Sequence, residues 1–377
     1  MHFKSDILII GGGLAGLTAA LHLHKAGLDV ILIEKNAYPN HKVCGEYISN
    51  EVLPYLKWLG VDVESLNPTH INKLHLTTQS GKSTYTNLPL GGFGISRFTL
   101  DNYLYQLLLN RGVKVFLESV TDVQFDEELF TVKTTNNITF TANQVIGAYG
   151  KRSSLDIKLD RPFIKKKAPF LAIKAHYNGV FPDDIVALHN FKGGYCGVSK
   201  VEDDKINICY LADYETFKKH KNIESYQQYV LMKNKVLKDI LERSELLFET
   251  PITISQLSFG AKEAVTNHVL MVGDAAGLIH PLCGNGMAMA FHGAKIVSET
   301  LIAYLNGDIK SRAKLEKKYT KIWNKTFNSR LKTGSILSSL LQREILTDFL
   351  INVITKMPWL LKQIIKRTHG KPLLGND

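Results

Sequence analysis

The 377-residue sequence lacks the long apolar runs that cross a membrane and the cysteine spacing that holds a metal or a disulfide framework. No run reaches the roughly eighteen apolar residues that a membrane-spanning helix requires. The four cysteines are scattered and none forms C-x-x-C, which favours a reducing compartment. No histidine spacing makes a convincing metal site, since His22 and His24 lie on a helix that we expect to be packed. A signal-peptide cleavage region is also missing near the first residue, so we expect a cytoplasmic protein.

Charge is distributed unevenly along the chain. The net charge is +11, and residues 310–377 hold 15 Lys and Arg against 4 Asp and Glu, which leaves the remainder neutral. Residues 310–332 predict a strongly basic helix, and residues 345–367 a mixed apolar and basic helix interrupted by Pro358. This composition is typical of a helix at an anionic membrane surface, but a helical cap over a substrate pocket explains it equally. No nucleic-acid-binding module is recognisable, so no nucleic-acid partner is expected.

The first sixty residues predict a dinucleotide site. A short aliphatic strand, residues 6–10, runs into Gly11, Gly13 and Gly16, which fit G-x-G-x-x-G and open a helix. The first glycine permits a tight turn, the second lets a pyrophosphate approach the backbone, and the third lets the helix pack closely on the strand. A second strand ends at Glu34, whose carboxylate suits ribose hydroxyls and disfavours the 2′-phosphate of NADP.

A second glycine-rich segment decides between NAD and FAD. A strand over residues 269–272 is followed by Gly273-Asp274, then by Pro281, Gly284 and Gly286 ahead of a long helix. This order resembles the second FAD motif of flavoproteins with the para-hydroxybenzoate hydroxylase-like fold. The resemblance implies FAD as cofactor, with Asp274 on the ribityl chain and the Pro281–Gly286 loop beside the flavin. The predicted FAD-binding residues are Gly11, Gly13, Ala15, Gly16, Glu34, Lys35, Cys44, Gly45, Arg97, Gly273, Asp274, Pro281, Gly284, Asn285, Gly286 and Met287.

Two shorter stretches extend this resemblance and also depart from it. Arg97 and Asp101 match the family's R-x-x-x-D helix, which implies that Arg97 approaches FAD. A solvated arginine on a helix capped by Thr99 is the alternative. Tyr149 stands where the family has the aspartate of A-D-G, a residue that also serves NAD(P)H. The electron donor, NAD(P)H or another, is therefore left open.

The middle of the chain changes its hydrophobic pattern. Long buried runs give way to the alternating polarity of antiparallel strands, which places Tyr195 and Cys196 on opposite faces of one strand. The predicted fold is α/β, a Rossmann-like FAD-binding domain with a parallel sheet, an inserted antiparallel-sheet substrate domain and a helical C-terminal segment. The predicted boundaries are 1–70, 91–160 and 251–309 for the FAD-binding domain, 71–90 and 161–250 for the substrate domain, and 310–377 for the basic segment.

The stretch "KVCGEYISNEVLPYLKWLGV" resembles the geranylgeranyl reductase branch of this fold, which saturates prenyl double bonds with reduced FAD. Cys44 is then a candidate catalytic residue, as proton donor or as pocket wall. Tyr195 is the second candidate, since it matches the tyrosine of the branch's Y-x-W-x-F-P motif, whose other aromatic residues are absent here. The alternatives are a flavin monooxygenase acting on a phenolic, quinone-type or polyketide substrate, and a non-catalytic prenyl-binding protein. His280 either assists catalysis or packs as a loop residue.

Overall fold

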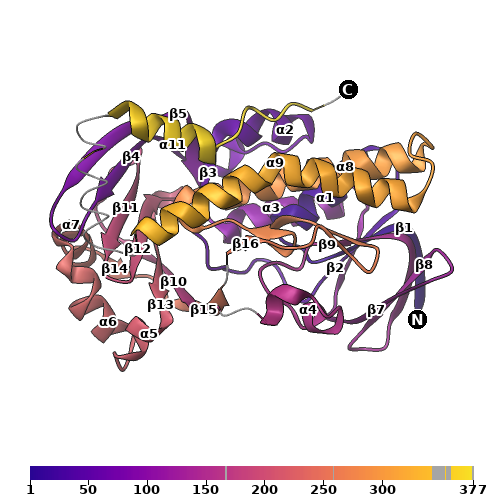
Figure 1. Cartoon of the computed structure of the whole chain (residues 1–377), viewed down its shortest axis with the longest axis horizontal. Coiled ribbons are helices and arrows are strands. Elements are labelled where there is room, and N and C mark those ends of the chain that lie inside the picture. The colour runs from indigo at the N-terminus through magenta and orange to yellow at the C-terminus, as the bar shows by residue number, and fades with distance from the viewer. Residues whose placement is uncertain (166–167, 258, 342–352, 354–357, 376–377) are drawn as a thin grey trace.

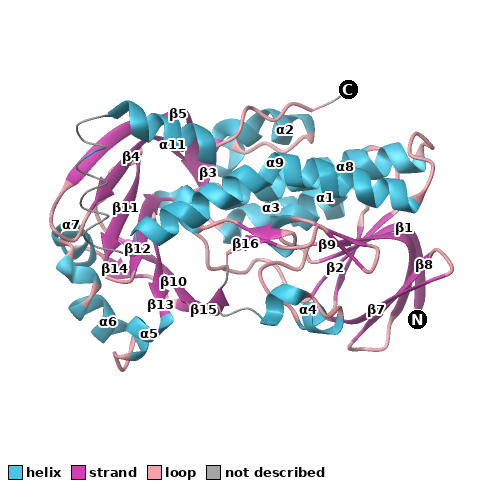
Figure 2. Ribbon diagram, viewed as in Figure 1, coloured by secondary structure: helices cyan, strands magenta, loops and turns pink. Residues whose placement is uncertain are grey.

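The computed structural model describes residues 1–377 except 166–167, 258, 342–352, 354–357 and 376–377. Two β-sheets stand at opposite ends of the elongated molecule in Figure 1. The long helices α8 (Gly286–Leu305) and α9 (Arg312–Leu341) pack side by side, and α9 reaches from the first sheet towards the second. Both sheets are covered by helices, as Figure 2 shows, which confirms the α/β fold class.

The first sheet contains the predicted parallel core. Its strand order is β17-β18-β9-β1-β2-β6, and the neighbouring pairs from β18 to β6 are parallel. The hairpin of β7 and β8 extends it through β9. The strands are β1 (His2–Ile10), β2 (Val30–Glu34), β6 (Lys114–Leu117), β7 (Val120–Asp126), β8 (Leu129–Thr134), β9 (Thr139–Gly147), β17 (Val265–Thr266) and β18 (Val269–Met271).

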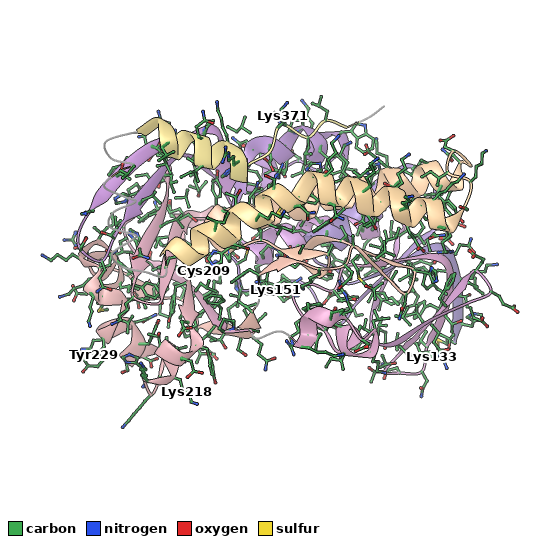
Figure 3. The ribbon with its side chains drawn as sticks, viewed as in Figure 1. Lys133, Lys151, Cys209, Lys218, Tyr229 and Lys371 are labelled. Atoms are coloured by element: carbon green, nitrogen blue, oxygen red, sulfur yellow. The ribbon has the colours of Figure 1, made fainter. Side chains whose placement is uncertain are left out.

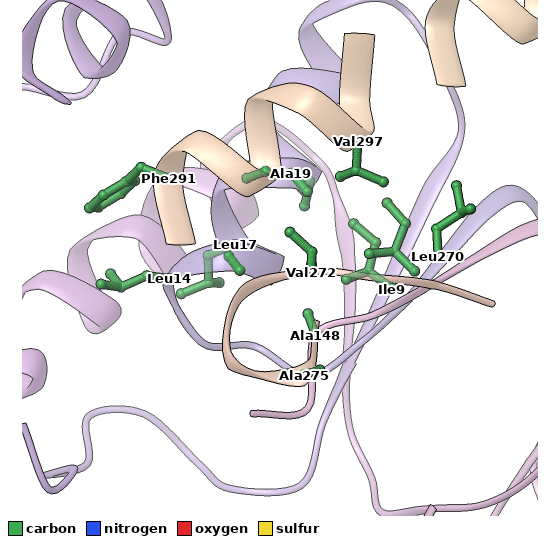
Figure 4. Packing of buried hydrophobic residues seen from close by; sticks show 14 of the residues in the cluster. Ile9, Leu14, Leu17, Ala19, Ala148, Leu270, Val272, Ala275, Phe291 and Val297 are labelled. Atoms are coloured by element: carbon green, nitrogen blue, oxygen red, sulfur yellow. The ribbon is translucent and has the colours of Figure 1, made fainter. Parts of the chain in front are cut away.

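Helices α1 (Leu14–Lys25) and α8 hold this sheet in place through an apolar core. Figure 4 shows Leu17 and Ala19 of α1 and Val297 of α8 gathered around Ile9 of β1. Each of these four side chains is fully buried. Burying a large aliphatic side chain contributes about 1.5–3 kcal/mol, so this core fixes the positions of the strand ends. Helices α2 (Leu53–Trp58), α3 (Arg97–Asn110) and α4 (Ser154–Lys158) complete this part of the molecule.

The second sheet is mostly antiparallel, with the order β14-β10-β13-β12-β11-β4-β5-β3 and β15 also paired to β10. It extends beyond the ranges predicted for the substrate domain, because β3 and β15 join it. Its strands are β3 (Tyr47–Ser49), β4 (Thr69–Thr77), β5 (Ser83–Gly94), β10 (Phe170–Asn178), β11 (Ile185–Phe191), β12 (Gly194–Lys200), β13 (Ile206–Asp213), β14 (Glu245–Leu246) and β15 (Ile252–Leu257). A separate small sheet pairs β16 (Gly260–Ala261) with β19 (Gly277–Leu278).

The two faces of the second sheet have different neighbours. One face, which includes Cys196, packs in an apolar cluster with residues of α6 (Ile223–Tyr229) and α7 (Lys235–Glu242); α5 (Tyr214–Lys218) follows β13. Tyr195 belongs to another cluster, with Ala172 and Leu211. The predicted placement of Tyr195 and Cys196 on opposite faces is therefore confirmed.

The C-terminal segment folds as helices where the structure describes it. Helix α9 contains all but the first two residues of the predicted basic helix, 310–332, and continues to Leu341. Of the predicted helix over residues 345–367, the part before 358 lies outside the described residues except for residue 353. Helix α11 (Pro358–Thr368) follows, with Pro358 as its first residue. None of the helices described is both long and apolar enough to cross a bilayer.

Candidate functional site

A cavity of about 1210 Å³ lies at the edge where the parallel strands of the first sheet end. Its wall includes the terminal or next residue of each parallel strand, namely Gly11, Glu34, Glu118, Ala148 and Val272. Ligands of open α/β sheets bind at this carboxyl edge. The volume exceeds the ~300–1,000 Å³ of a typical small-molecule pocket, so the cavity can hold a cofactor and a second molecule.

The glycine turn after β1 is a cradle that side chains would fill. Gly11 has φ +108°, and a Cβ there would lie 2.5 Å from the Ala148 carbonyl oxygen. A Cβ on Gly16 would lie 1.9 Å from the Gly11 carbonyl oxygen. At Gly13, by contrast, an added Cβ would meet only Arg97, at 3.6 Å. Gly13 thus leaves the N-terminus of α1 open to a phosphate group.

Glu34 is held at the end of β2 by backbone donors. Its Oε2 accepts from the Gly12 N–H at 2.6 Å and its Oε1 from the Asn36 N–H at 3.0 Å. Tyr38 Oη donates to the Gly12 carbonyl oxygen and so braces the same turn. The carboxylate lines the cavity, where its remaining lone pairs fit ribose hydroxyls. Together with the glycine cradle it fits the adenosine end of FAD.

Arg97 reaches the cavity from the first turn of α3. Its Nε and Nη2 donate to the two Asp101 oxygens at 2.6 and 2.7 Å, and Lys42 Nζ donates to Asp101 at 3.0 Å. Ser96 is the N-cap, since its hydroxyl accepts from the Thr99 N–H at 3.0 Å. The alternative that Thr99 caps the helix is therefore wrong. Arg97 lines the cavity and is not a solvated arginine.

The second glycine-rich loop closes the cofactor groove. Gly273, at φ +61°, turns the chain two residues after the end of β18, and Asp274 lines the cavity. Helix α8 begins at Gly286, where an added Cβ would meet only Ile279, at 3.6 Å. The structure brings all the predicted FAD-binding residues to the cavity wall except Gly16, which packs beneath the turn.

Beyond this groove the cavity continues as an apolar arm. Its floor is the second sheet and its roof is α11, and both present aliphatic side chains. Gly197 in the middle of the floor adds no side chain, which leaves depth there. The aliphatic residues of the arm are Leu74, Leu76, Leu88, Val186, Leu188, Leu361, Ile364 and Ile365.

Cys44 and Tyr195, the predicted catalytic residues, both line the cavity. The Cys44 carbonyl oxygen accepts from Asn207 Nδ2 at 3.2 Å, which places the loop above β13. Burial raises the pKa of Tyr195 well above its usual value, so its hydroxyl stays protonated at neutral pH. Their catalytic roles stay predictions.

Cys209 is a cavity residue that sequence reasoning missed. It lines the wall and lies beside Gly197 of β12 and Lys174 of β10 in the sheet register. Burial, with a smaller effect from Cys44, raises the pKa of Cys209 to about 12. The alternation of residues along β13 was a signal that could have found it.

Glu46 was also missed, although it lies within the quoted Cys-Gly-Glu stretch. Its side chain is fully buried, with Oε1 2.8 Å from Lys174 Nζ and Oε2 2.6 Å from His176 Nε2. Oε1 also accepts from the Arg97 N–H at 2.9 Å. Burial alone would raise the pKa of Glu46, but Lys174 and His176 outweigh it and hold the pKa below its usual range. This carboxylate ties the Cys44 loop to α3 and to β10.

The surroundings of His280 favour a packing role over a role in catalysis. Its ring is buried against Tyr195, Phe170 and Phe259, and it is absent from the cavity wall. Burial lowers the pKa of His280 to about 3, so the ring is neutral. Across the residues that the structure describes, no cluster of His, Cys, Asp and Glu could hold a metal ion.

Comparisons with known proteins agree with this geometry. The family model described as "FAD binding domain" matches residues 4–322. Conditioned medium factor receptor 1 of Dictyostelium discoideum is 24% identical over 382 residues, covering 90% of this chain and 71% of that protein. Digeranylgeranylglycerophospholipid reductase 1 of Methanosphaera stadtmanae is 22% identical, covering 86% and 82%. The structure of the flavin-dependent brominase Bmp2 superposes with a TM-score of 0.81 at 18% identity, covering 97% and 93%.

Substitutions at two glycines of the cradle are expected to affect different properties, stability at Gly16 and FAD affinity at Gly13. Gly16→Ala forces a Cβ onto a backbone oxygen and is expected to lower the free energy of unfolding of the FAD-free protein by at least ~1–3 kcal/mol. Gly13→Ala meets no such clash, and is expected to keep that stability while weakening FAD binding roughly tenfold or more by obstructing the phosphate approach. Urea unfolding and FAD titration of both variants check this. Equal stability of the two FAD-free variants would contradict it.

Removing the Glu46 side chain should destabilise the protein, because it leaves a buried cation unpaired. Glu46→Ala leaves Lys174 without its carboxylate and is expected to lower the free energy of unfolding by about 3–5 kcal/mol. Because the two charges depend on each other, Glu46→Ala with Lys174→Ala should cost less than the sum of the two single changes. Glu242→Ala, at an exposed position of α7, is the control for urea unfolding. A loss below ~1 kcal/mol for Glu46→Ala would contradict the cost of the unpaired cation, and a double change equal to the sum of the single changes would show that the pair is not coupled.

Proposed function

The chain belongs to the FAD-binding-domain family, and from this premise we propose that it uses reduced FAD to saturate double bonds of a prenyl-type hydrocarbon chain. It is an FAD-dependent oxidoreductase of the geranylgeranyl reductase-like branch. The observation that carries the proposed reaction is one continuous cavity, which joins the cofactor groove to an arm with aliphatic walls. A relative named for reduction of a digeranylgeranyl lipid supports the same substrate class.

The arm recognises a hydrocarbon by excluding water. Leu74 and Leu76 of β4 lie beside Val186 and Leu188 of β11 in parallel register, and together they form an apolar strip of floor. Each methylene buried against such walls contributes about 0.8 kcal/mol. A chain of several isoprene units therefore binds here without a charged group to anchor it.

FAD, when bound and reduced, supplies the hydride for such a reduction. The protein must supply the proton, and it must keep the reacting carbons dry. Tyr195 Oη and Cys209 Sγ both hold protons at neutral pH, because burial raises the pKa of each group. Both lie beside the open floor at Gly197, within the sheet positions that face the cavity. Cys44 lines the same cavity, from the loop that is bonded to Asn207 of β13.

Anaerobic turnover tests the proposal. The photoreduced holoenzyme is mixed with a geranylgeranyl lipid without oxygen, and we expect the product to gain two hydrogens per reduced double bond. Labelled oxygen is then admitted to a second sample. Incorporation of one oxygen atom, with no anaerobic product, would overturn the reductase and establish the monooxygenase alternative. Leu188→Trp, which fills the arm, should slow a long prenyl chain roughly tenfold more than a short one; exposed Leu109→Trp is the control.

The basic C-terminal surface suits an anionic membrane from which such a lipid would come. Lys366, Arg367 and Lys371 are exposed, and so is Leu374, three residues after Lys371, at 65%. Each basic residue near an anionic bilayer contributes about 1 kcal/mol of attraction. We therefore extend the proposal to peripheral binding of this surface, with α11 turned towards the lipid.

Charge reversal tests the membrane contact. Lys366→Glu with Lys371→Glu should reduce co-sedimentation with phosphatidylserine vesicles by roughly tenfold or more. The control is Lys133→Glu with Lys218→Glu, at positions on the side of the molecule away from Lys371 in Figure 3. Equal losses in both variants would mean that net charge, and not this surface, governs binding. Unchanged binding of the first variant would reject the contact.

A further inference from the structure

The C-terminal strap, residues 358–375, joins the two halves of the molecule. Helix α11 packs along β5, and its Leu361 and Ile365 form part of the roof over the apolar arm. After the helix, Leu373 is buried in the core of the first half. A Cβ on Gly375 would lie 2.1 Å from the Trp58 ring of α2. The strap therefore covers the arm and is fastened on the far side of it.

Glu51 is the point at which the strap is fastened. Its carboxylate is 1% exposed and accepts from the Gly370 N–H, while its backbone oxygen accepts from the Leu373 N–H at 2.7 Å. Arg330 of α9 lies 3.6 Å from the other carboxylate oxygen. One residue thus receives the strap through its side chain and through its main chain.

The same residue contacts the flavin loop. The Asn285 side chain hydrogen-bonds the Glu51 carboxylate, and Asn285 is the N-cap of α8 on the cavity wall. Tyr47, four residues before Glu51, repeats this connection. It lies 3.5 Å from a Cβ built on Gly284, and its ring is 6.4 Å from the His369 ring of the strap. The loop and the strap therefore share one short segment, residues 47–51.

We propose that Glu51 is a positioning residue that latches the strap over the apolar arm and links this closure to the flavin loop, so that a lipid chain enters and leaves when the Gly370–Glu51 bond opens. Burial disfavours the charged carboxylate and raises the pKa of Glu51, with Arg330 and Gly370 opposing that effect. The latch is bonded while the Gly370 N–H donates to this carboxylate, and it is released when that hydrogen bond opens. The inference rests on the proposed function only in taking the arm as the place of the chain.

Release of a fluorescent fatty acid from the oxidised holoenzyme tests the latch without turnover. In Glu51→Gln the carboxylate charge is lost, so the hydrogen bonds from Gly370 and Asn285 are no longer charge-assisted and Arg330 loses its partner. We expect cis-parinaric acid to leave roughly tenfold faster, the factor that corresponds to about 1.4 kcal/mol, as a charge-assisted hydrogen bond contributes. Trypsin should also cut the strap after Lys366 and Arg367 faster, and the flavin absorbance should shift because the hydrogen bond between Asn285 and residue 51 is weaker.

Two further variants make the result decisive. Arg330→Gln keeps Glu51 and should change both rates in the same direction by a smaller factor, so it decides the matter if Glu51→Gln fails to fold. Exposed Glu242→Gln should behave as the wild type. Wild-type release and cleavage rates in Glu51→Gln and Arg330→Gln overturn the latch, as does faster cleavage with unchanged release. If the wild type binds no parinaric acid, the apolar arm of the proposed function fails, and the latch fails as a lipid gate with it; lipid binding without alkene reduction refutes only the reaction.

Discussion

Everything at the site depends on the parallel strands of the first sheet ending at one edge. Parallel pairing places successive carboxyl ends side by side, and the turns that follow them form one groove. Helix α1 lies close to β1 because Gly16 packs onto the Gly11 carbonyl oxygen. A side chain at this position would separate the helix from the strand. The core around Ile9 and Val297 then keeps helices and strands at that distance. Cofactor binding is thus a consequence of packing as much as of the residues that face the ligand.

The second constraint is the joint between the two sheets. Glu46 has φ +56°, an uncommon conformation for a residue with a side chain, and its buried carboxylate meets Lys174 and His176 across the domain boundary. Such a cluster is costly to desolvate, and it is retained only where geometry and partners are complete. Because the same carboxylate accepts from the Arg97 N–H, it holds the helix that presents Arg97. The position of the substrate floor relative to the flavin groove is set by this contact.

Sequence reasoning reached the parts of the site that local pattern determines. The glycine turn, Glu34 and the loop before α8 follow from spacing within a few residues, and the alternation along β12 correctly separated Tyr195 from Cys196. It did not find the partners of Glu46, because Lys174 and His176 lie far away in the chain and only the β10–β13 register brings them to the site. It also misplaced the cap of α3, since Ser96 and Thr99 are both good capping residues and only the backbone geometry distinguishes them.

The short segment from Cys44 to Glu51 shows why these failures fall where they do. Within eight residues it supplies a cavity thiol, the buried carboxylate of the joint, the tyrosine against the flavin loop and the carboxylate that fastens the strap. No periodic pattern describes such a segment, because each side chain contacts a different part of the molecule. A local resemblance can mark the stretch as important, but the partners that these residues contact lie in α3, β10, α8, α9 and the strap. The segment therefore aligns the cofactor groove, the substrate floor and the roof with one another. A substitution at any of these four residues is expected to displace the element that this residue contacts.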